Sequence, residues 1–595
     1  MEEMTLNKDQ TEKKRTIVNK LVNSGINITP SILEFVLNLE KPMEDLNLII
    51  KETSFIPDFK SHLTEKVLTK ISNDQIQKVL KRKVISPKAH INENKMKNRD
   101  LPTIVSDNLN LKKLREDPNP LAAPYNNQLI QIKKISQSDS NTSLTNDISI
   151  EKKIEVKPFG STKSSFAFNP IAKQYSSDYK ILTDPTGKLF TTGEYEDFYD
   201  YTVDKFNKLR MMMRKRSDVL SATNINNILR LTNKAEVSTI GLVSNMHQTK
   251  NNNYLFNLED LTGIVNVLVR KDSEKEENFK TIQRTVNDQM VYVEGTYSPG
   301  EKGKKGIIFV NYITKIDIPT DFKPSISTDP LSIALISDTH IGSKEFEETL
   351  LKRFINFLNG KIGDKNIRMM AGKVKYLVIN GDLVDGIGVY PKQHKDLSIS
   401  DIYQQYKRAA EILAEIPEYI KIFYTSGNHE PVRNAIPRPA VPKKYCEDLV
   451  NFGITCIGNP SMIETHNVKT LIYHGESMHD MNMLIHDLDI NKPTEIMKEL
   501  LICRHLAPVY GEKTQIAPTN KDWLLIEKIP DIFHTAHVHI NGLGYHRNVS
   551  LVNSGCFQAQ TDFMKSFGIV PTPGIVPIIE LDTMKPFELD LKTNR

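Results

Sequence analysis

The sequence predicts a multidomain protein in which a small helical domain and a β-barrel precede a larger, layered α/β domain. The chain has 595 residues, whereas a single domain usually has about 100–200. Its apolar pattern changes along the chain from helical periodicity to short alternating strands, and then to strand-length apolar runs separated by helical stretches. With 25% charged and 39% hydrophobic residues, the composition excludes fibrous and wholly disordered classes.

The N-terminal region predicts a helical domain followed by a linker. Within residues 1–80, Ile17–Val22 has helical spacing, and Thr29-Pro30 provides an N-cap and a first-turn proline for a further helix. Residues 81–180 contain few aromatic or periodic apolar residues, and their centre is rich in Ser, Asn, Asp and Thr. We expect a disordered linker there, because such a composition cannot form a core.

A helical connector and a barrel are expected next. Residues 181–234 contain an amphipathic helix from Phe198 to Met213, which we interpret as core-packing rather than nucleic-acid-binding. Residues 235–322 contain five strand-like runs separated by turn signals. The runs are Val237–Val243, Tyr254–Leu258, Ile264–Val269, Met290–Gly295 and Ile307–Ile313. Five such strands predict a Greek-key barrel of the oligonucleotide/oligosaccharide-binding (OB) fold.

The role of this barrel stays open from the sequence. OB barrels bind single strands through aromatic side chains on a basic surface. The candidates are Tyr254, Phe256, Tyr292, Phe309 and Tyr312, beside Lys302, Lys304 and Lys305. The same aromatic residues could instead fill the barrel or contact a protein, so both nucleic-acid contact and protein scaffolding are considered.

Composition narrows the location and the chemistry. Lys plus Arg is 78 and Asp plus Glu is 73, a net charge of +5. With no apolar run of membrane-spanning length and no signal-like start, we expect a cytoplasmic protein without a membrane partner. The four cysteines occur singly, which argues against zinc knuckles and disulfide frameworks. Because 12 of the 15 histidines lie between 331 and 595, metal or acid-base chemistry is expected there.

The domain at 331–595 carries five segments in which an apolar strand is followed at once by metal-ligand residue types. They are Asp338-Thr339-His340, Gly381-Asp382-Leu383-Val384-Asp385, Gly427-Asn428-His429-Glu430, His474-Gly475-Glu476 and His537-Val538-His539. In layered α/β folds, ligand sites form where strands end. Side chains two apart in extended backbone point the same way, so an Asp-x-His or His-x-His pair can bind one metal or divide between two. Mixed nitrogen and oxygen donors suit manganese, iron or zinc.

Phosphate-ester hydrolysis is the reaction that such a site would support. Two divalent ions about 3.5–4 Å apart polarise a phosphodiester and lower the pKa of a bridging water. Asp382 could bridge the ions, and His429, outside the metal shell, could protonate the leaving 3′-oxygen. We interpret Asp385 as a turn cap in preference to a ligand. The histidines outside the five segments are interpreted as structural: His394, His466, His479, His486, His505 and His546.

The ordered set of five segments resembles the calcineurin-like metallophosphoesterase superfamily, whose nucleases include the Mre11 family. Residues around the motifs, with the barrel before them, resemble more closely the small subunits of archaeal family D DNA polymerases, over roughly 190–595. The matching stretches are Ser337–Ser343, Gly427–Arg433, His537–Tyr545 and Asn553–Thr561.

This resemblance implies a 3′-5′ exonuclease that proofreads during DNA replication for a separate, large catalytic polymerase subunit. Its DNA substrates would be single-stranded or mismatched 3′ ends, and its cofactor two divalent metal ions, Mn²⁺ by preference. One metal would be held by Asp338, His340, Asp382 and His539, the other by Asp382, Asn428, His474 and His537. His429 would be the catalytic imidazole, and the barrel and phosphoesterase faces would dock the large subunit.

One departure and two alternatives accompany this resemblance. Ala536 stands where the superfamily usually has glycine, and a positive φ there would be strained by alanine, although we expect the methyl group to be tolerated. The chain could instead be a non-catalytic scaffold subunit of the polymerase, or a free-standing Mre11-like repair nuclease. Every metal-ligand position of the superfamily is filled in this sequence, which favours a catalytic subunit over a scaffold. Mre11-like nucleases normally begin with the phosphoesterase domain, so the preceding barrel argues against a free-standing nuclease.

Overall fold

The computed structural model describes residues 168–592 apart from 220, 272–275, 301–304 and 567, together with 154–155 and scattered positions between 16 and 71. The chain divides into two compact units, residues 1–109 and 110–595. Most of the predicted linker at 81–180 lies outside the described residues, as do Lys302 and Lys304.

The described part of the first unit contains a helix and a pair of short strands. Helix α3 (Pro42–Thr53) buries Leu46 and Ile49, as its helical spacing of apolar residues requires. Strands β1 (Asn27–Ile28) and β2 (His62–Leu63) pair in parallel. The sequence did not predict this pair, since two residues are too few to show a periodicity.

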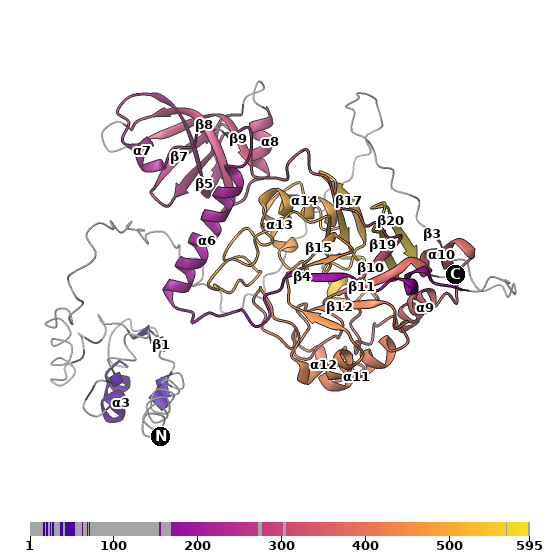
Figure 1. Cartoon of the computed structure of the whole chain (residues 1–595). Coiled ribbons are helices and arrows are strands. Elements are labelled where there is room, and N and C mark those ends of the chain that lie inside the picture. Colours follow the sequence, from indigo (N-terminus) through magenta and orange to yellow (C-terminus); the bar gives the residue numbers. More distant parts are fainter. Residues whose placement is uncertain are drawn as a thin grey trace, which may run out of the picture. The chain divides into compact units, whose positions relative to one another are not determined.

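Five strands in the second unit close into a barrel with the order β5-β6-β7-β9-β8 (Figure 1). They are β5 (Ala235–Gln248), β6 (Tyr254–Asp260), β7 (Gly263–Val269), β8 (Met290–Ser298) and β9 (Ile307–Lys315). All five predicted strands are therefore present, each at least as long as expected. At Gly295, an added Cβ would lie 2.1 Å from the backbone oxygen of Phe309, so the close approach of β8 and β9 requires glycine.

Three helices surround the barrel. They are α6 (Tyr195–Met213), α7 (Ile225–Leu229) and α8 (Glu276–Gln283). The α6 helix buries Phe206, Leu209 and Met213 in one apolar cluster with barrel residues, so its core-packing interpretation is confirmed. The Lys205 ammonium group on α6 donates to the Pro508 carbonyl at 2.6 Å, which links this helix to the α/β domain.

Ordered structure begins earlier than the sequence predicted. The 3₁₀ helix η1 (Ile171–Gln174) and strand β4 (Tyr179–Thr183) fall at the end of the range expected to be linker and at the start of the expected helical connector. Strand β4 pairs antiparallel with β14 (Ser461–Thr465), nearly 300 residues later in the chain. No local pattern could show this pairing, because the partner strand is so remote in sequence.

The α/β domain contains two sheets. The seven-stranded sheet has the order β13-β12-β11-β10-β19-β20-β3, and the six-stranded sheet the order β17-β18-β16-β15-β14-β4. The first comprises β13 (Thr455–Ile457), β12 (Lys421–Thr425), β11 (Val374–Asn380), β10 (Ser332–Ile336), β19 (Ile575–Glu580), β20 (Pro586–Asp590) and β3 (Ile154–Glu155). The second adds β17 (Gly542–His546), β18 (Val549–Asn553), β16 (Ile532–Thr535) and β15 (Val468–Ile472) to β14 and β4.

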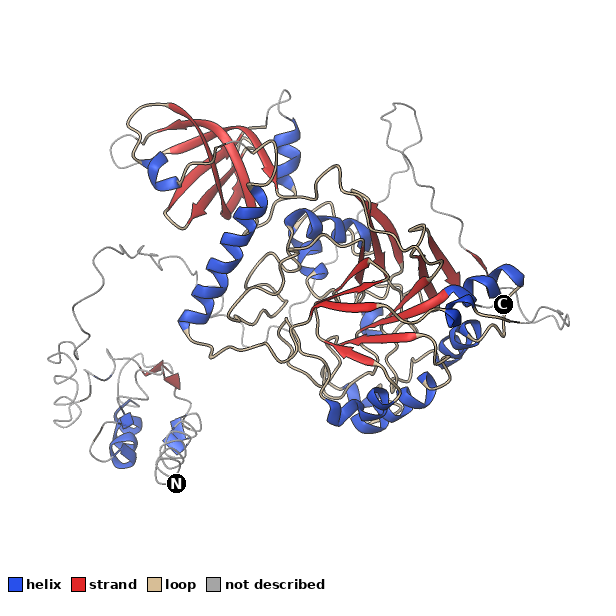
Figure 2. Ribbon diagram, in the orientation of Figure 1, coloured by secondary structure: helices blue, strands red, loops and turns tan. Residues whose placement is uncertain are grey.

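The two sheets share one apolar core and carry helices on their outer faces (Figure 2). Helices α9 (Glu348–Leu358), α10 (Lys365–Lys373), α11 (Ile402–Leu413) and α12 (Lys443–Asn451) pack against the first sheet. Helices α13 (Met478–Leu484) and α14 (Pro493–Cys503) pack against the second. The region from 331 onward is thus a layered α/β domain, as predicted.

Parallel pairing brings the predicted motifs to one end of this domain. Strands β10, β11 and β12 run parallel to one another, and β15 runs parallel to β16 in the other sheet. Each of the five strands is followed by one of the five segments, so their polar side chains meet where the strands end.

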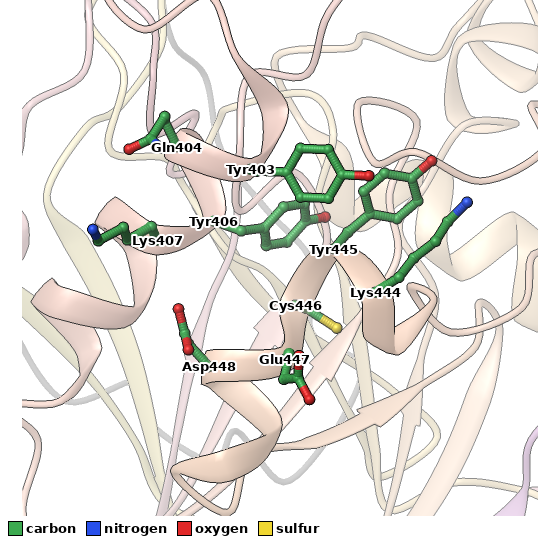
Figure 3. A pocket seen from close by; sticks show the side chains of 9 residues that line it. All are labelled: Tyr403, Gln404, Tyr406, Lys407, Lys444, Tyr445, Cys446, Glu447 and Asp448. Carbon is green, nitrogen blue, oxygen red and sulfur yellow. The ribbon is translucent and has the colours of Figure 1, made fainter.

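A separate pocket of about 240 Å³ lies between α11 and α12 (Figure 3). It is lined by Tyr403, Gln404, Tyr406, Lys407, Lys444, Tyr445, Cys446, Glu447 and Asp448. None of the predicted site residues lines it, so it is distinct from the strand-end site. Among the residues that the structure describes, no helix is long and apolar enough to cross a membrane.

Candidate metal centre

The first ligand cluster consists of Asp338, His340 and His539. The His340 and His539 Nε2 atoms are 3.1 Å apart, and His539 Nε2 lies 3.4 Å from Asp338 Oδ1. Within the described chain, this buried Asp338 Oδ1 has no hydrogen-bond partner. Donors bonded to one ion at about 2.1 Å lie about 3 Å apart, so the spacing fits a shared divalent cation.

The second cluster consists of Asp382, His474 and His537, with Asn428 beside it. His474 Nε2 lies 3.3 Å from Asp382 Oδ2 and 3.1 Å from the Asn428 side-chain oxygen. Asp382 Oδ2 is also 3.9 Å from His340 Nε2, a member of the first cluster. Asp382 therefore lies between the two clusters, where a bridging carboxylate would be needed.

His429 adjoins both clusters and is partly exposed. Its Nδ1 lies 2.6 Å from the backbone oxygen of Asp385, which can only accept, so Nδ1 carries the proton of this hydrogen bond. Nε2, 4.0 Å from Asp382 Oδ2, is the free nitrogen of the ring. The side chain is 14% exposed, whereas His474 is fully buried. All eight predicted site residues are thus brought together by the fold.

Asp385 has a different role from the predicted turn cap. Its buried carboxylate accepts a hydrogen bond from His340 Nδ1 at 3.0 Å and another from the Gln393 side-chain amide at 3.0 Å. This contact leaves His340 Nε2 unprotonated and directed toward His539, as a metal ligand requires. The turn-cap interpretation is wrong, because the Asp385 carboxylate binds the side chains of His340 and Gln393 instead of a backbone N–H of the turn. The contact with His340 forms only in the folded chain, so the Gly-Asp-x-x-Asp pattern could not show it.

Glu430 is a second supporting residue that the sequence did not reveal. Its carboxylate accepts from the backbone N–H groups of Asp382, Leu383 and Gly427 at 3.0, 2.8 and 2.7 Å. The Tyr424 hydroxyl donates to it as well, at 2.7 Å. Burial, together with the charge of Asp382, raises the pKa of Glu430 to about 7. The side chain therefore ties together the two loops that carry Asp382 and Asn428.

The six histidines interpreted as structural fall into three groups. His466, His505 and His546 pair with Asp329, Asp522 and Asp317, in keeping with structural roles. His394 and His486 are exposed. His479 differs from expectation, since its ring packs edge-on against the ligand candidate His537 at 5.3 Å between centroids. It packs against the second cluster, a contact that its place three residues after the His474-Gly475-Glu476 segment did not reveal.

Several ligand positions have left-handed backbone. The φ angles are 49° for Asp338 and His340, 50° for Asp382, 70° for His537 and 61° for His539. Residues other than glycine rarely adopt such angles, and those that do concentrate at functional sites. Ala536 is not among the positive-φ residues, and its N–H donates to the His474 carbonyl at 2.8 Å. Alanine therefore causes no left-handed strain at this position.

Charge within the site balances between carboxylates and imidazoles. Burial lowers the pKa of His340 and holds that of His537 well below its usual range. Burial also opposes a charged His474, but Asp382 outweighs it and raises the pKa of His474 to about 9. Burial disfavours the Asp382 carboxylate, yet His474 and His429 keep its pKa well below the usual value. The Asp382 carboxylate is therefore anionic, as a metal ligand must be.

Comparison with known proteins places this fold and site in the class of the smaller, B-type subunits of DNA polymerases. Residues 333–539, which contain every predicted ligand, match the family model that describes the B subunits of DNA polymerases alpha and epsilon. The relatives include DNA polymerase II small subunits from three archaea. That of Methanothermobacter thermautotrophicus is 39% identical over 69% of this chain and 83% of its own. That of Methanocaldococcus jannaschii is 38% identical over 69% of this chain and 68% of its own. That of Archaeoglobus fulgidus is 38% identical over 67% of this chain and 78% of its own.

The chain belongs to the small subunits of archaeal DNA polymerase II, the family D polymerase. The family inferred from the motifs is therefore confirmed. A small subunit implies a large catalytic partner, and this protein takes part in DNA replication.

Proposed function

We propose that this small subunit is a metal-dependent 3′-5′ exonuclease that removes nucleotides from single-stranded or mismatched 3′ ends for the polymerase. The observation that carries the proposal is the convergence of seven ligand-type side chains from five separate strand ends into two clusters joined by Asp382. A surface of unrelated polar residues would not bury them together beside an accessible imidazole.

The residues fit two divalent ions, Mn²⁺ by preference. Asp338, His340, Asp382 and His539 would hold one, while Asp382, Asn428, His474 and His537 would hold the other. The unpartnered Asp338 oxygen and the facing imidazole nitrogens of the first cluster support this assignment. When bound, such ions would polarise the phosphate and lower the pKa of the attacking water.

The chain itself would supply proton transfer and orientation. His429 holds its Nδ1 proton on the Asp385 carbonyl, so Nε2 is the ring atom that exchanges protons with the substrate; in the doubly protonated ring, Nε2 would donate its proton to the leaving 3′-oxygen. Asp385 and Glu430 keep the ligand loops in place through hydrogen bonds to His340 and to the Asp382 backbone. Both contacts are formed before substrate arrives, which favours precise positioning.

We further propose that the barrel is an OB fold that scaffolds the large subunit, and that the domain after it has the calcineurin-like layered fold. The closed order β5-β6-β7-β9-β8, with β7 and β9 parallel, supports the first assignment. Phe256 and Tyr292 are buried, and Tyr254 packs against Phe279. Phe256 and Tyr292 are therefore unavailable for stacking on nucleic acid, whereas Tyr254, Phe309 and Tyr312 are half-buried. We place the complex in the cytoplasm, with the DNA.

The proposal is tested with the purified full-length chain, Mn²⁺ and an end-labelled primer whose 3′ end is mismatched, with and without the large subunit. We expect stepwise shortening from the 3′ end. His429→Ala should abolish cutting and leave Mn²⁺ binding intact, while the matched control His466→Ala, at a remote structural pair, should cut normally. No Mn²⁺-dependent shortening under either condition would favour the scaffold alternative.

A second experiment tests whether the chain acts as a polymerase subunit or as a free-standing nuclease. The chain, affinity-purified from its native cell, should bring with it a much larger polymerase chain. Its repeated absence, with exonuclease activity retained, would favour the Mre11-like alternative.

A further inference from the structure

A row of aromatic rings leads from the candidate metal centre to the protein surface. The His340 and His429 rings meet edge-on, 4.6 Å apart between centroids. The ring centroids of Tyr390 and His429 are 6.5 Å apart. Those of Phe563 and Tyr390 are 6.4 Å apart, with an angle of 26° between the two ring planes. Phe563, on helix α15 (Asp562–Ser566), is 59% exposed. The row therefore includes, at Phe563, a ring that offers much of its area to solvent.

Tyr390 is fixed relative to the metal centre. It belongs to the loop that follows Asp385, and Gln393 of this loop donates to both the backbone and the side-chain oxygen of Asp385. The same Gln393 accepts the N–H of Val389, and the Tyr390 hydroxyl donates to Asp396. Since Asp385 also orients His340, the ring position and the ligand position depend on one residue.

The surroundings of these rings combine exposed apolar side chains with charges of both signs, since Asp396 accepts from the Tyr390 hydroxyl and Asp562, 98% exposed, precedes Phe563. Ile387 and Val389, in the same loop, are 49% and 36% exposed, and Val570 is 67% exposed. Lys392 and Lys395 of the loop are exposed as well. Exposed apolar groups beside a polar site usually mark a binding surface. Basic side chains next to exposed rings are the combination with which proteins hold single-stranded nucleic acid.

We propose that Tyr390 and Phe563 form a stacking platform for unpaired nucleobases of the DNA strand whose 3′ end enters the metal centre. This inference rests on the proposed exonuclease function and names how its substrate is selected. Aromatic faces stack on any base, so the platform would not depend on sequence. In a paired duplex, both faces of a base are covered by its neighbours, so the platform favours frayed or mismatched ends over annealed ones.

Continuity with the metal centre identifies DNA as the occupant. The platform begins one ring away from His429, the proposed proton donor, and the adjoining lysines suit the negative phosphates. A core-packing role does not explain Phe563, because most of its surface faces solvent. Docking of the large subunit on Phe563 is the competing occupant, and binding measurements separate the two.

The test measures binding without hydrolysis. Fluorescence anisotropy records the affinity of the full-length chain for a labelled oligothymidine and for an abasic oligonucleotide of equal length, both in excess EDTA. Phe563→Ala should weaken oligothymidine binding about 5- to 150-fold, the loss expected for one stacked base, and should leave abasic binding unchanged. Phe563→Trp, which keeps an aromatic face at this position, should retain oligothymidine binding. Phe452→Ala, which removes an equally exposed ring (59%) at the end of α12, is the matched control.

The outcomes are distinct. Equal oligothymidine affinity for Phe563→Ala and wild type would overturn the platform, as would equal losses on the abasic strand. Weakened capture of the large subunit with unchanged oligothymidine affinity would assign Phe563 to that partner instead. Because no metal is present, failure of the exonuclease proposal is seen separately: wild type would not shorten the primer with Mn²⁺, while its oligothymidine binding would still depend on Phe563.

Discussion

Replacing Glu430 with glutamine should destabilise the α/β domain, although the two side chains have the same shape. All four groups around this carboxylate can donate, and three of them are backbone N–H groups. Glutamine must direct its own NH₂ toward at least one N–H. If the NH₂ group takes the place of Oε1, the Leu383 N–H loses its acceptor, which costs about 1–3 kcal/mol. If it takes the place of Oε2, the N–H groups of Asp382 and Gly427 both lose their acceptor, which costs about 2–6 kcal/mol.

The chain contains a single tryptophan, Trp523, which is buried in this domain. Its fluorescence, excited selectively, therefore reports unfolding of the domain in urea. We expect the Glu430→Gln midpoint to fall by an amount equivalent to at least about 1 kcal/mol, and Mn²⁺ affinity measured by calorimetry to fall with it, since Asp382 loses its support.

The matched control is Glu464→Gln. Glu464 forms a solvent-exposed ion pair with Lys180 at 3.2 Å, a kind of pair that contributes about 0–1 kcal/mol. If Glu430→Gln unfolds at the same urea concentration as wild type and this control, then the hydrogen bonds to Glu430 do not hold the ligand loops together, and the reasoning is refuted.

Three further substitutions test other contacts. Asp385→Ala should reduce Mn²⁺ affinity about 10- to 100-fold, because His340 loses its orienting partner, and calorimetry that shows wild-type affinity would contradict this. Gly427→Ala should abolish metal binding, since its Cβ would lie 2.3 Å from Asp382 Oδ1, as measured in the same titration. Arg216 lowers the pKa of Asp218 to about 2, below its usual 3.8, so the stabilisation is present above about pH 4 and lost as pH falls toward 2. Wild type should lose stability over this interval and Asp218→Asn should lose less, which urea midpoints at pH 4 and 2.5 would show.

Local patterns in the sequence predicted much of the fold. The barrel strands follow from alternating apolar residues between turn signals, and the strand-end motifs from apolar runs that stop at a ligand. Strand β4 could not be predicted, because its partner β14 lies nearly 300 residues away. Pairing between such remote segments depends on the assembled core rather than on either segment alone.

The site shows the same division. Ligand chemistry and the places of strand ends indicated the five segments, and the family resemblance then selected eight residues within them. Asp385, Glu430 and His479 act through other side chains or backbone groups, and any polar residue in a loop could do so. Their roles became visible only once the fold placed them in contact.

Backbone strain gives a reason for function that does not depend on ligand chemistry. Five ligand positions, Asp338, His340, Asp382, His537 and His539, have left-handed φ angles. At about 1–2 kcal/mol for each such residue, their combined cost is about 5–10 kcal/mol, comparable with the net stability of a whole domain. Among the described residues, 16 residues other than glycine have positive φ, and these five are the ones gathered at a single place. Under the proposed function, the cost would be that of aiming the five side chains at bound cations, and the buried core beneath the strand ends supplies the rigidity to keep them there.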